Sequence, residues 1–155
     1  MASMRLVLNG DNVIACAQTG SGKTGAFMIP LVMRQMKEQR NKKTIVLAPS
    51  RELAEQIGQV GRAVARGTGV VVSDTSQSDK SITVASIICA TPNKIIALLD
   101  ESKLKLNTCS TMVLDECDKM VELSGNKLNQ DDAKFFISQV KTIKAACASQ
   151  VSLNN

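Results

Sequence analysis

The feature that most constrains this sequence is a glycine-rich octet, Ala17-Gln18-Thr19-Gly20-Ser21-Gly22-Lys23-Thr24, between an apolar run and a helix-compatible segment. Its glycines allow backbone conformations that are closed to residues with a Cβ, so successive N–H groups can converge on one point. The start of the following helix would add about half a positive charge there. This order of strand, loop and helix predicts a phosphate-binding loop.

The residues of this loop have distinct expected roles. The backbone of residues 17–24 would enclose the phosphates of a nucleotide, and Lys23 would contact the terminal phosphates. Thr24 would give its hydroxyl oxygen to Mg²⁺, which prefers oxygen ligands. The alternative is an ordinary glycine-rich turn, but the Lys-Thr pair at this spacing favours nucleotide binding. One departure from the general pattern is Ala17, which stands where the first glycine is usual.

A second set of chemically competent residues follows an apolar run later in the chain. The run Val113-Leu114 leads directly into Asp115-Glu116-Cys117-Asp118. Asp115 would hold Mg²⁺ and Glu116 would orient the attacking water, which with Lys23 completes the predicted catalytic set. Because the chain has no His, any general base must be a carboxylate. Acidic residues at a helix start are the structural alternative, and the phosphate loop upstream favours the catalytic interpretation.

Apolar runs alternate with helix-compatible segments along the chain. Runs typical of strands occupy residues 12–16, 44–48, 70–72, 86–90 and 111–114, with a weaker candidate at 145–147. Helices are expected at 23–40, 50–64, 94–99 and 133–140, and loops at 73–80 and 124–132. Pro30 should kink the first helix or disturb one of its turns, and the buried side of that helix should hold Phe27, Leu31 and Met28. The second helix should bury Leu53, Ile57, Val60 and Val64. This alternation predicts an α/β fold, a mostly parallel sheet with helices on both faces, and a shared site at the carboxyl ends of its strands.

Composition narrows the possible classes of protein. The length of 155 residues suits one domain with a real core, and no apolar run is long enough to cross a membrane. Aromatic residues make up only 2%, without Trp or Tyr, which argues against a surface that stacks bases on rings. The five cysteines form no C-x-x-C pair, which favours a reducing intracellular compartment, cytoplasmic or nuclear. The net charge of +5 arises from residues 1–70, and this basic half suits a polyanionic partner, although a solvated face is the more common meaning of such an excess.

Four short motifs follow one another along the chain. They are residues 17–24, Pro49-Ser50-Arg51-Glu52-Leu53-Ala54, Thr91-Pro92-Asn93-Lys94 and Asp115-Glu116-Cys117-Asp118. They resemble motifs I, Ia, Ib and II of the DEAD-box RNA helicases, most like the Ded/Vasa branch, and Cys117 makes the acid box similar to the DECD variant. The resemblance covers residues 5–120 and implies the first of two RecA-like P-loop NTPase domains, with ATP and Mg²⁺ as cofactors.

The resemblance also implies an RNA surface. In the family, motifs Ia and Ib contact the RNA sugar–phosphate backbone, and these contacts carry over to Pro49, Arg51 and Thr91. Arg51 and Lys94 stand near predicted helix N-termini, where side-chain charge and backbone N–H groups together favour phosphate. Solvent-exposed basic residues are the alternative, and Arg51 could instead pair with a neighbouring glutamate.

Several departures from the family pattern affect these expectations. Asn93-Lys94 replaces the usual Gly-Arg, and Lys lacks the two-pronged hydrogen bonding of Arg. The Gly-Gly element between motifs Ia and Ib is missing, and motif III is at best Ala148-Ser149-Gln150. The chain starts after the expected place of the adenine-reading Q motif and ends before any second domain. We therefore expect residues 1–155 to be a single RecA-like domain, a fragment that lacks both.

Three functional hypotheses follow. The first is the ATP-binding core of an ATP-dependent RNA helicase, which hydrolyses ATP to remodel or unwind RNA with a second RecA-like domain and is nearly inactive alone. The second is a catalytically degenerate module that binds nucleotide or RNA, against which the intact Lys23, Asp115 and Glu116 count. The third is a P-loop ATPase outside the helicases, and motifs Ia and Ib count against it.

Overall fold

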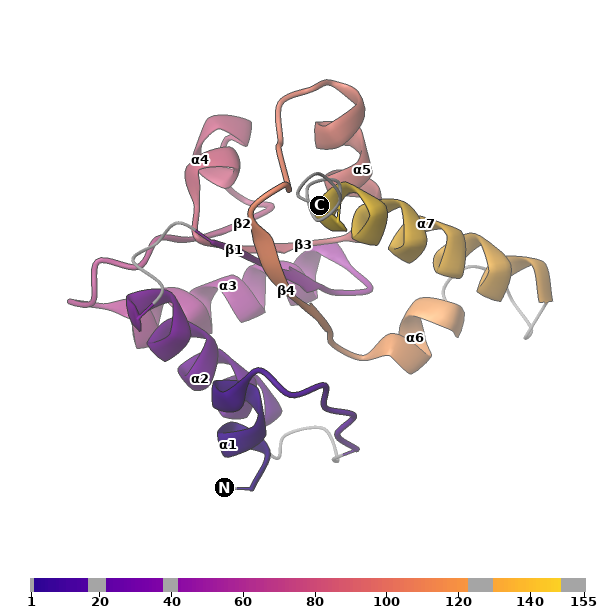
Figure 1. Ribbon diagram of the computed structural model, residues 1–155. Coiled ribbons are helices and arrows are strands. Elements are labelled where there is room, and N and C mark those ends of the chain that lie inside the picture. Colours follow the sequence, from indigo (N-terminus) through magenta and orange to yellow (C-terminus); the bar gives the residue numbers. More distant parts are fainter. Residues whose placement is uncertain (1, 17–21, 38–41, 123–129, 149–155) are drawn as a thin grey trace, which may run out of the picture.

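A parallel sheet with helices on both faces forms the centre of the structure (Figure 1). The computed structural model describes residues 2–16, 22–37, 42–122 and 130–148. Within them, four strands pair in the spatial order β2-β3-β1-β4, all in parallel. The strands are β1 (Lys43–Leu47), β2 (Val72–Asp74), β3 (Ile87–Ala90) and β4 (Cys109–Leu114). The helices are α1 (Ala2–Asn9), α2 (Lys23–Lys37), α3 (Arg51–Ala65), α4 (Asp79–Val84), α5 (Pro92–Asp100), α6 (Cys117–Glu122) and α7 (Gln130–Ala148). The predicted α/β fold is confirmed.

The sheet separates two layers of the core. Side chains alternate between the faces of a strand, so neighbours along β1 and β3 enter different layers. On one face, Val46 and Ile87 pack with residues of α2 and α3. On the other, Ile45 and Ile88 pack with residues of α4, α5, α6 and α7. The central strand β3 is buried along its whole length, as expected for a parallel strand covered on both sides, whereas β4 is only partly buried.

Two of the predicted strands are wrong. Residues 12–16 form no strand; Ile14 is 99% exposed, and the segment runs beside α1 (Figure 1). An apolar run becomes a strand only where its backbone pairs with a neighbour, and the described strands pair only with one another, in the order β2-β3-β1-β4. Residues 145–147 belong to α7, because Ala146 and Cys147 reach the core as part of that helix rather than as a sheet edge.

Several other elements begin or end at residues that differ from the predicted ones. The third strand begins two residues late and ends at Asp74, and α4 begins at Asp79, so the predicted loop at 73–80 was partly wrong. Both changes depend on tertiary contacts of polar residues, which hydrophobic periodicity does not register. Residues 2–9, for which no element was predicted, form α1, and α7 is longer than predicted at both ends. Residues 123–129 of the predicted loop at 124–132 lie outside the described residues.

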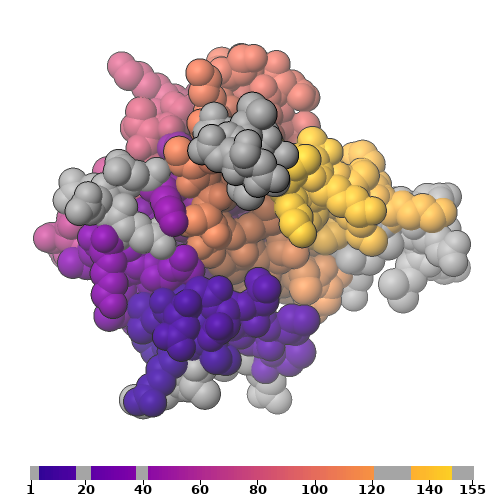
Figure 2. Space-filling view, viewed as in Figure 1, coloured from indigo at the N-terminus to yellow at the C-terminus, as the bar shows by residue number. Residues whose placement is uncertain are grey.

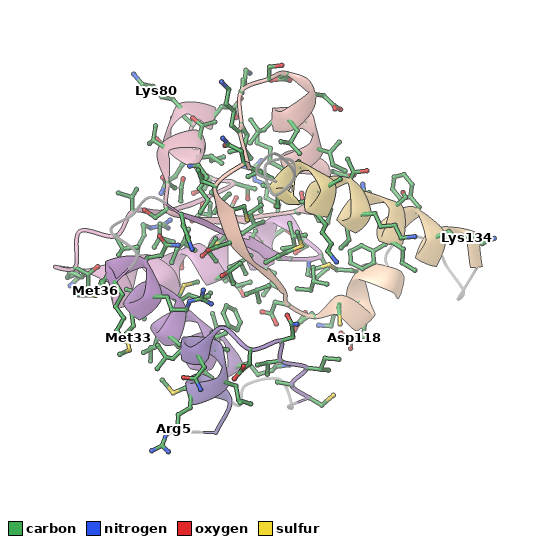
Figure 3. The ribbon with its side chains drawn as sticks, in the orientation of Figure 1. Arg5, Met33, Met36, Lys80, Asp118 and Lys134 are labelled. Atoms are coloured by element: carbon green, nitrogen blue, oxygen red, sulfur yellow. The ribbon has the colours of Figure 1, made fainter. Side chains whose placement is uncertain are left out.

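Helix α2 continues through Pro30 to Lys37. Proline has no N–H to donate, so one backbone hydrogen bond is lost there, but the helix is not ended. Met28 and Leu31 are buried, as predicted, whereas Phe27, which was expected on the same side, is only partly buried. Met33 and Met36 lie on the outer side of α2 and point away from the core (Figure 3).

Helix α3 buries mostly small residues, and only one of the four large aliphatic residues predicted to be buried is fully so. Ile57 is buried as predicted, but Val60 is exposed, and the face against the sheet also holds Gly58 and Gly61. A Cβ placed on Gly58 would lie 2.6 Å from the Cβ of Asp74, which is closer than two such atoms can approach. The backbone of α3 therefore lies too near β2 for larger side chains, which rotates the buried stripe relative to the predicted one.

Asp74 ends β2 with a fully buried carboxylate. Burial raises the pKa of Asp74, but hydrogen bonds from Ser76 and the guanidinium of Arg62 outweigh it and hold that pKa below its ordinary value. The Ser76 backbone N–H donates to Oδ1 over 2.9 Å, and Arg62 pairs with Oδ2. A buried charge needs such partners, so this pair ties α3 to the sheet.

All five cysteines carry free thiols. Cys89 lies in β3, where burial, together with the nearby Asp74 carboxylate, raises its thiol pKa to about 12. None of the helices within the described ranges has the length and hydrophobicity needed to cross a membrane.

Candidate functional site

The ends of three neighbouring strands bring the sequence motifs to one edge of the sheet. Motif Ia follows β1, motif Ib follows β3 and motif II follows β4, and these strands are adjacent in the order β3-β1-β4. Backbone hydrogen bonds extend past the strands: Ala48 N–H donates to the carbonyl of Ala90, and Asp115 N–H to that of Leu47, both over 3.0 Å. This edge is the carboxyl end of the strands, where ligands of such sheets bind, as predicted.

The nucleotide side of this edge combines the start of α2 with the end of β4. Residues 17–21 of the predicted phosphate loop lie outside the described residues. Gly22 has a φ of +81°, which residues with a Cβ rarely adopt, and Lys23 and Thr24 form the first turn of α2. Burial, together with the Glu116 carboxylate, raises the pKa of Asp115, and the positive charge of Lys23 opposes this rise. Lys23 and Asp115 therefore lie close enough to interact, although 92 positions apart in the sequence.

Glu116 occupies an unusual backbone position. Its φ of +50° lies in the left-handed region, which costs a non-glycine residue about 1–2 kcal/mol. Its carboxylate accepts from Lys119 Nζ at 2.9 Å, and its carbonyl accepts from the N–H of Met120 at 3.1 Å, which starts α6. Strained residues of this kind cluster at active sites. The sequence identified Glu116 from its neighbours alone and gave no sign of this conformation.

The donor set on this side suits Mg²⁺. Thr24 offers a hydroxyl oxygen and Asp115 a half-buried carboxylate, both hard oxygen ligands. In the described part of the chain, no group of three His, Cys, Asp or Glu is placed to hold a metal ion. Mg²⁺ in phosphate sites uses one or two protein oxygens and keeps its waters, so two donors are enough for it.

A cleft of about 340 Å³ lies on the other side of the edge, between the N-termini of α3 and α5 and the flank of α7. Its walls are formed by Pro49, Ser50, Arg51, Thr91, Pro92, Asn93, Met120, Phe135, Phe136 and Gln139. Motifs Ia and Ib, 40 positions apart, thus share one cavity with a helix that follows motif II. In the space-filling view α7, in yellow, lies against the orange segment of β4 and α6 (Figure 2).

The motif Ia residues that we predicted to contact RNA lie on this cleft. Ser50 caps α3, its hydroxyl accepting from the N–H of Leu53 at 3.2 Å. Pro49 forms part of the wall, and Arg51 has a side chain 67% exposed to solvent. The Arg51 guanidinium donates from Nε to Glu55 at 2.8 Å, one of the pairings foreseen as an alternative to RNA contact. An exposed ion pair contributes little and is readily exchanged for a phosphate.

The residues of motif Ib have two different environments. Thr91 lines the cleft and caps α5, its hydroxyl accepting from the N–H of Lys94 at 3.4 Å. The Lys94 ammonium instead pairs with Asp79 of α4 at 2.7 Å, and Asp79 also pairs with Lys103. Asn93, which stands where the family has glycine, faces the cleft and accepts a hydrogen bond from Gln139 of α7. The structure therefore brings Arg51 and Thr91 together and directs Lys94 toward α4.

Sequence reasoning missed the wall contributed by α7. Phe135 is 57% exposed and Phe136 only 8%, so the first ring faces the cleft opening while the second anchors the helix in the core. The low aromatic content argued against base stacking, yet two of the three Phe in the chain line this one cavity. The adjacent pair in an otherwise polar segment was the available signal. Of the possible motif III, Ala148 ends α7, and residues 149 and 150 lie outside the described residues.

Comparison with known proteins places this arrangement in a family. Residues 1–149 match the family model described as DEAD/DEAH box helicase. The probable ATP-dependent RNA helicase DDX4 of Rattus norvegicus is 36% identical over 137 residues, which cover 78% of this chain and 19% of that protein. A DEAD box protein from the hyperthermophile Methanococcus jannaschii superposes with a TM-score of 0.77 at 29% identity, over 95% of this chain and 39% of its own. Saccharomyces cerevisiae Dbp5, solved with Nup159, Gle1, IP6 and ADP, superposes with a TM-score of 0.75 at 29% identity, over 92% of this chain and 37% of its own.

These matches identify the class of protein: the chain belongs to the DEAD/DEAH-box helicase family. Its fold is the RecA-like domain of that family, which confirms the resemblance seen in the motifs, including the likeness to the Ded/Vasa branch. The chain spans about a fifth of the length of the curated relatives it matches.

Proposed function

We propose that this chain is the ATP-binding core domain of an ATP-dependent RNA helicase, and that it hydrolyses ATP to remodel or unwind RNA when paired with a second RecA-like domain. The observation that carries this proposal is that Lys23, in the described end of motif I, and motif II lie at the same sheet edge as motifs Ia and Ib. Lys23 acts electrostatically on Asp115, while Arg51 and Thr91 share a cleft next to them.

On the nucleotide side, we assign roles as follows. The backbone of residues 17–24 (Ala17, Gln18, Thr19, Gly20, Ser21, Gly22, Lys23 and Thr24) binds the phosphates of ATP, and the Lys23 ammonium neutralises their charge. Thr24 and Asp115 hold Mg²⁺, which when bound offsets the charge on the transferring phosphoryl group. Glu116 orients the attacking water and accepts its proton. The left-handed backbone at Glu116 supports this role, because it fixes the direction in which the carboxylate leaves the strand end.

On the cleft side, RNA binds through its sugar–phosphate backbone. Arg51 supplies charge, and Pro49 and Thr91 shape the wall at two helix N-termini, where peptide N–H groups favour phosphate. Lys94 adds to the positive field near α5, although in this structure it is paired with Asp79. Contacts of this kind tolerate any base sequence.

The proposal assigns the remaining machinery to a second domain. By resemblance, that domain supplies arginine fingers, each of which typically contributes about 10³–10⁵ in rate. The present chain should therefore show marginal ATPase activity, no stimulation by RNA and no unwinding. We also expect the working protein to act in a reducing compartment, cytoplasmic or nuclear.

The test is phosphate release at saturating Mg²⁺ and ATP, with and without RNA, with Glu116→Gln as the blank. Adding the second RecA-like domain of a relative, in trans or fused, should raise turnover and make it respond to RNA. Robust RNA-stimulated turnover by the chain alone would contradict the assignment as half of an active site. Intact ATP binding with no gain from the second domain would favour the degenerate binding module instead.

A further inference from the structure

The cleft contains a feature that backbone binding does not use. Its α7 wall presents Phe135, an aromatic ring 57% exposed, opposite the two helix N-termini that carry Arg51 and Thr91. Burial in water-free surroundings is the usual state of a phenylalanine ring, and its neighbour Phe136 shows that state at 8% exposed. A single exposed ring is common on protein surfaces, but this ring lines a cleft together with the Arg51 guanidinium, so the cleft can take a ligand that has both a planar apolar part and an anionic part.

Helix α7 holds this ring in a fixed place. Phe136 and Ile143 enter the core on one face of the sheet and anchor the helix along its length. Gln139, one turn after Phe135, donates from Nε2 to Oδ1 of Asn93, which joins α7 directly to motif Ib. The helix also packs against α5 and α6. Phe135 is therefore set at a defined position relative to motif Ib rather than on a free surface helix.

The chemistry of the walls selects the ligand. Arg51 and the N-termini of α3 and α5 favour phosphate, while the Phe135 ring offers a face for stacking. Lys134, next to it on α7, points outward at the far end of the helix (Figure 3). A volume of about 340 Å³ falls at the lower end of the range for small-ligand sites. A nucleotide unit of a single strand combines the required phosphate and planar base.

We propose that Phe135 is a stacking platform for one base of the bound RNA strand, and that the Gln139–Asn93 hydrogen bond positions it. This rests on the proposed function, because the RNA backbone must first lie along motifs Ia and Ib. Stacking adds affinity without sequence preference, since every base has an aromatic face. Phe135 is the direct contact, and Gln139 and Asn93 act through it.

The chain offers a clean optical test because it has no Trp or Tyr. Phe135→Trp creates a single fluorophore in the cleft, and stacking of a base on the new indole quenches its emission. Ile137→Trp is the matched control, since Ile137 is also exposed on α7 but projects about 200° further round the helix. A short uridine homopolymer should quench the emission of the Phe135→Trp variant and leave that of the Ile137→Trp variant unchanged. An abasic ribose–phosphate strand should leave both unchanged.

Affinity measurements separate stacking from apolar packing. By anisotropy of labelled RNA, Phe135→Ala should weaken uridine homopolymer binding about 5- to 150-fold. Phe135→Leu keeps apolar bulk without a ring and should weaken it similarly, whereas affinity for the abasic strand should not change. Gln139→Ala should cause a smaller loss and, when combined with Phe135→Trp, should reduce the quenching. Circular dichroism and thermal unfolding establish that each variant is folded.

Four results would overturn the inference. The stacking role is wrong if the Phe135→Trp variant binds RNA saturably without quenching. It is also wrong if the Phe135→Leu variant binds RNA with wild-type affinity. Both outcomes leave the proposed RNA function standing. Absence of RNA binding by the wild-type chain removes both the stacking role and the proposed RNA function. Emission of the Phe135→Trp variant that changes with protein concentration alone, without RNA, assigns the ring to contact between protein molecules instead.

Discussion

The nucleotide side and the cleft side of the sheet edge differ in how far they keep the family residues and in the interactions that join those residues. The nucleotide side keeps the family residues Lys23, Asp115 and Glu116, and the interaction between motif I and motif II within the described residues is one of charge. The cleft side departs from the family at motif Ib, yet its residues are tied together by helix caps and a hydrogen bond between Asn93 and Gln139. Phosphoryl transfer restricts residue type, because few side chains supply the charge and metal ligands it needs. Binding a nucleic-acid backbone restricts shape, which several residue combinations provide.

Within the cleft side, the two helices that carry motifs Ia and Ib also differ in what supports them. Helix α3, which carries Arg51, is fixed to β2 through the buried Asp74 and its partner Arg62. Helix α5, which follows motif Ib, is linked to α4 by Lys94 and Asp79, both about one third exposed. A buried ion pair and an exposed one look alike in sequence but have very different energetic consequences. Four predictions test the differences between the two sides of the sheet edge and between these two ion pairs.

The largest effect should follow from Arg62→Met, which leaves the Asp74 carboxylate buried without its cationic partner. We expect the free energy of unfolding to fall by about 3 kcal/mol, near the lower limit for breaking a buried pair because Arg62 itself is partly exposed. Urea denaturation followed by circular dichroism measures this. Lys94→Met is the matched control and should cost less than about 1 kcal/mol. Equal losses in the two variants would contradict the contrast.

Next in size is the effect of Lys23→Ala on nucleotide binding. Removing the ammonium leaves the phosphates with backbone donors only, so affinity for ADP or ATP should fall at least about tenfold, as for a lost charge-assisted contact. Calorimetry measures the affinity. Lys37→Ala, at the exposed end of the same helix, should leave it unchanged. RNA affinity should be unaffected in both variants, and an unaltered nucleotide affinity in Lys23→Ala would remove the phosphate-loop assignment.

A smaller change should follow from Arg51→Ala on the cleft side. Loss of one phosphate contact should lower the dependence of log affinity for single-stranded RNA on log salt by about one unit, uniformly across sequences. Titrations between low and physiological salt give the slope. Arg66, exposed at the other end of α3, supplies the control variant Arg66→Ala, which should keep the wild-type slope. A strong preference for one RNA sequence would argue against backbone recognition.

The smallest effect concerns the loss of stability at low pH. Because the pKa of Asp74 is lowered in the fold, its contribution to stability is present above the unfolded-state pKa of about 3.9 and is lost as the pH falls through the folded value. Unfolding free energy should thus decline below about pH 4, and Asp74→Asn should flatten that decline. Asp79→Asn, which removes an exposed carboxylate, should flatten it less, and more weakly still at high salt. The reverse order would show that the surface cluster dominates.

The sequence by itself determined the family, from the order of the motifs, and the α/β class, from the alternation of apolar runs, and it predicted the residues of the nucleotide side. Phosphate and Mg²⁺ chemistry needs particular side chains at short, fixed spacings, so Lys23, Thr24, Asp115 and Glu116 are visible in a linear chain. The central strands were also predictable, because strands buried on both faces are continuous apolar runs.

Only the tertiary structure decided the rest. Segment 12–16 has the composition of a strand but pairs with none, and α3 buries glycines rather than Val60 because its backbone lies against Asp74. The cleft depends on α7, whose Phe135 and Gln139 meet motifs Ia and Ib from more than 40 positions away. Partners, packing distance and burial are properties of three-dimensional contact, and local sequence periodicity contains no record of them.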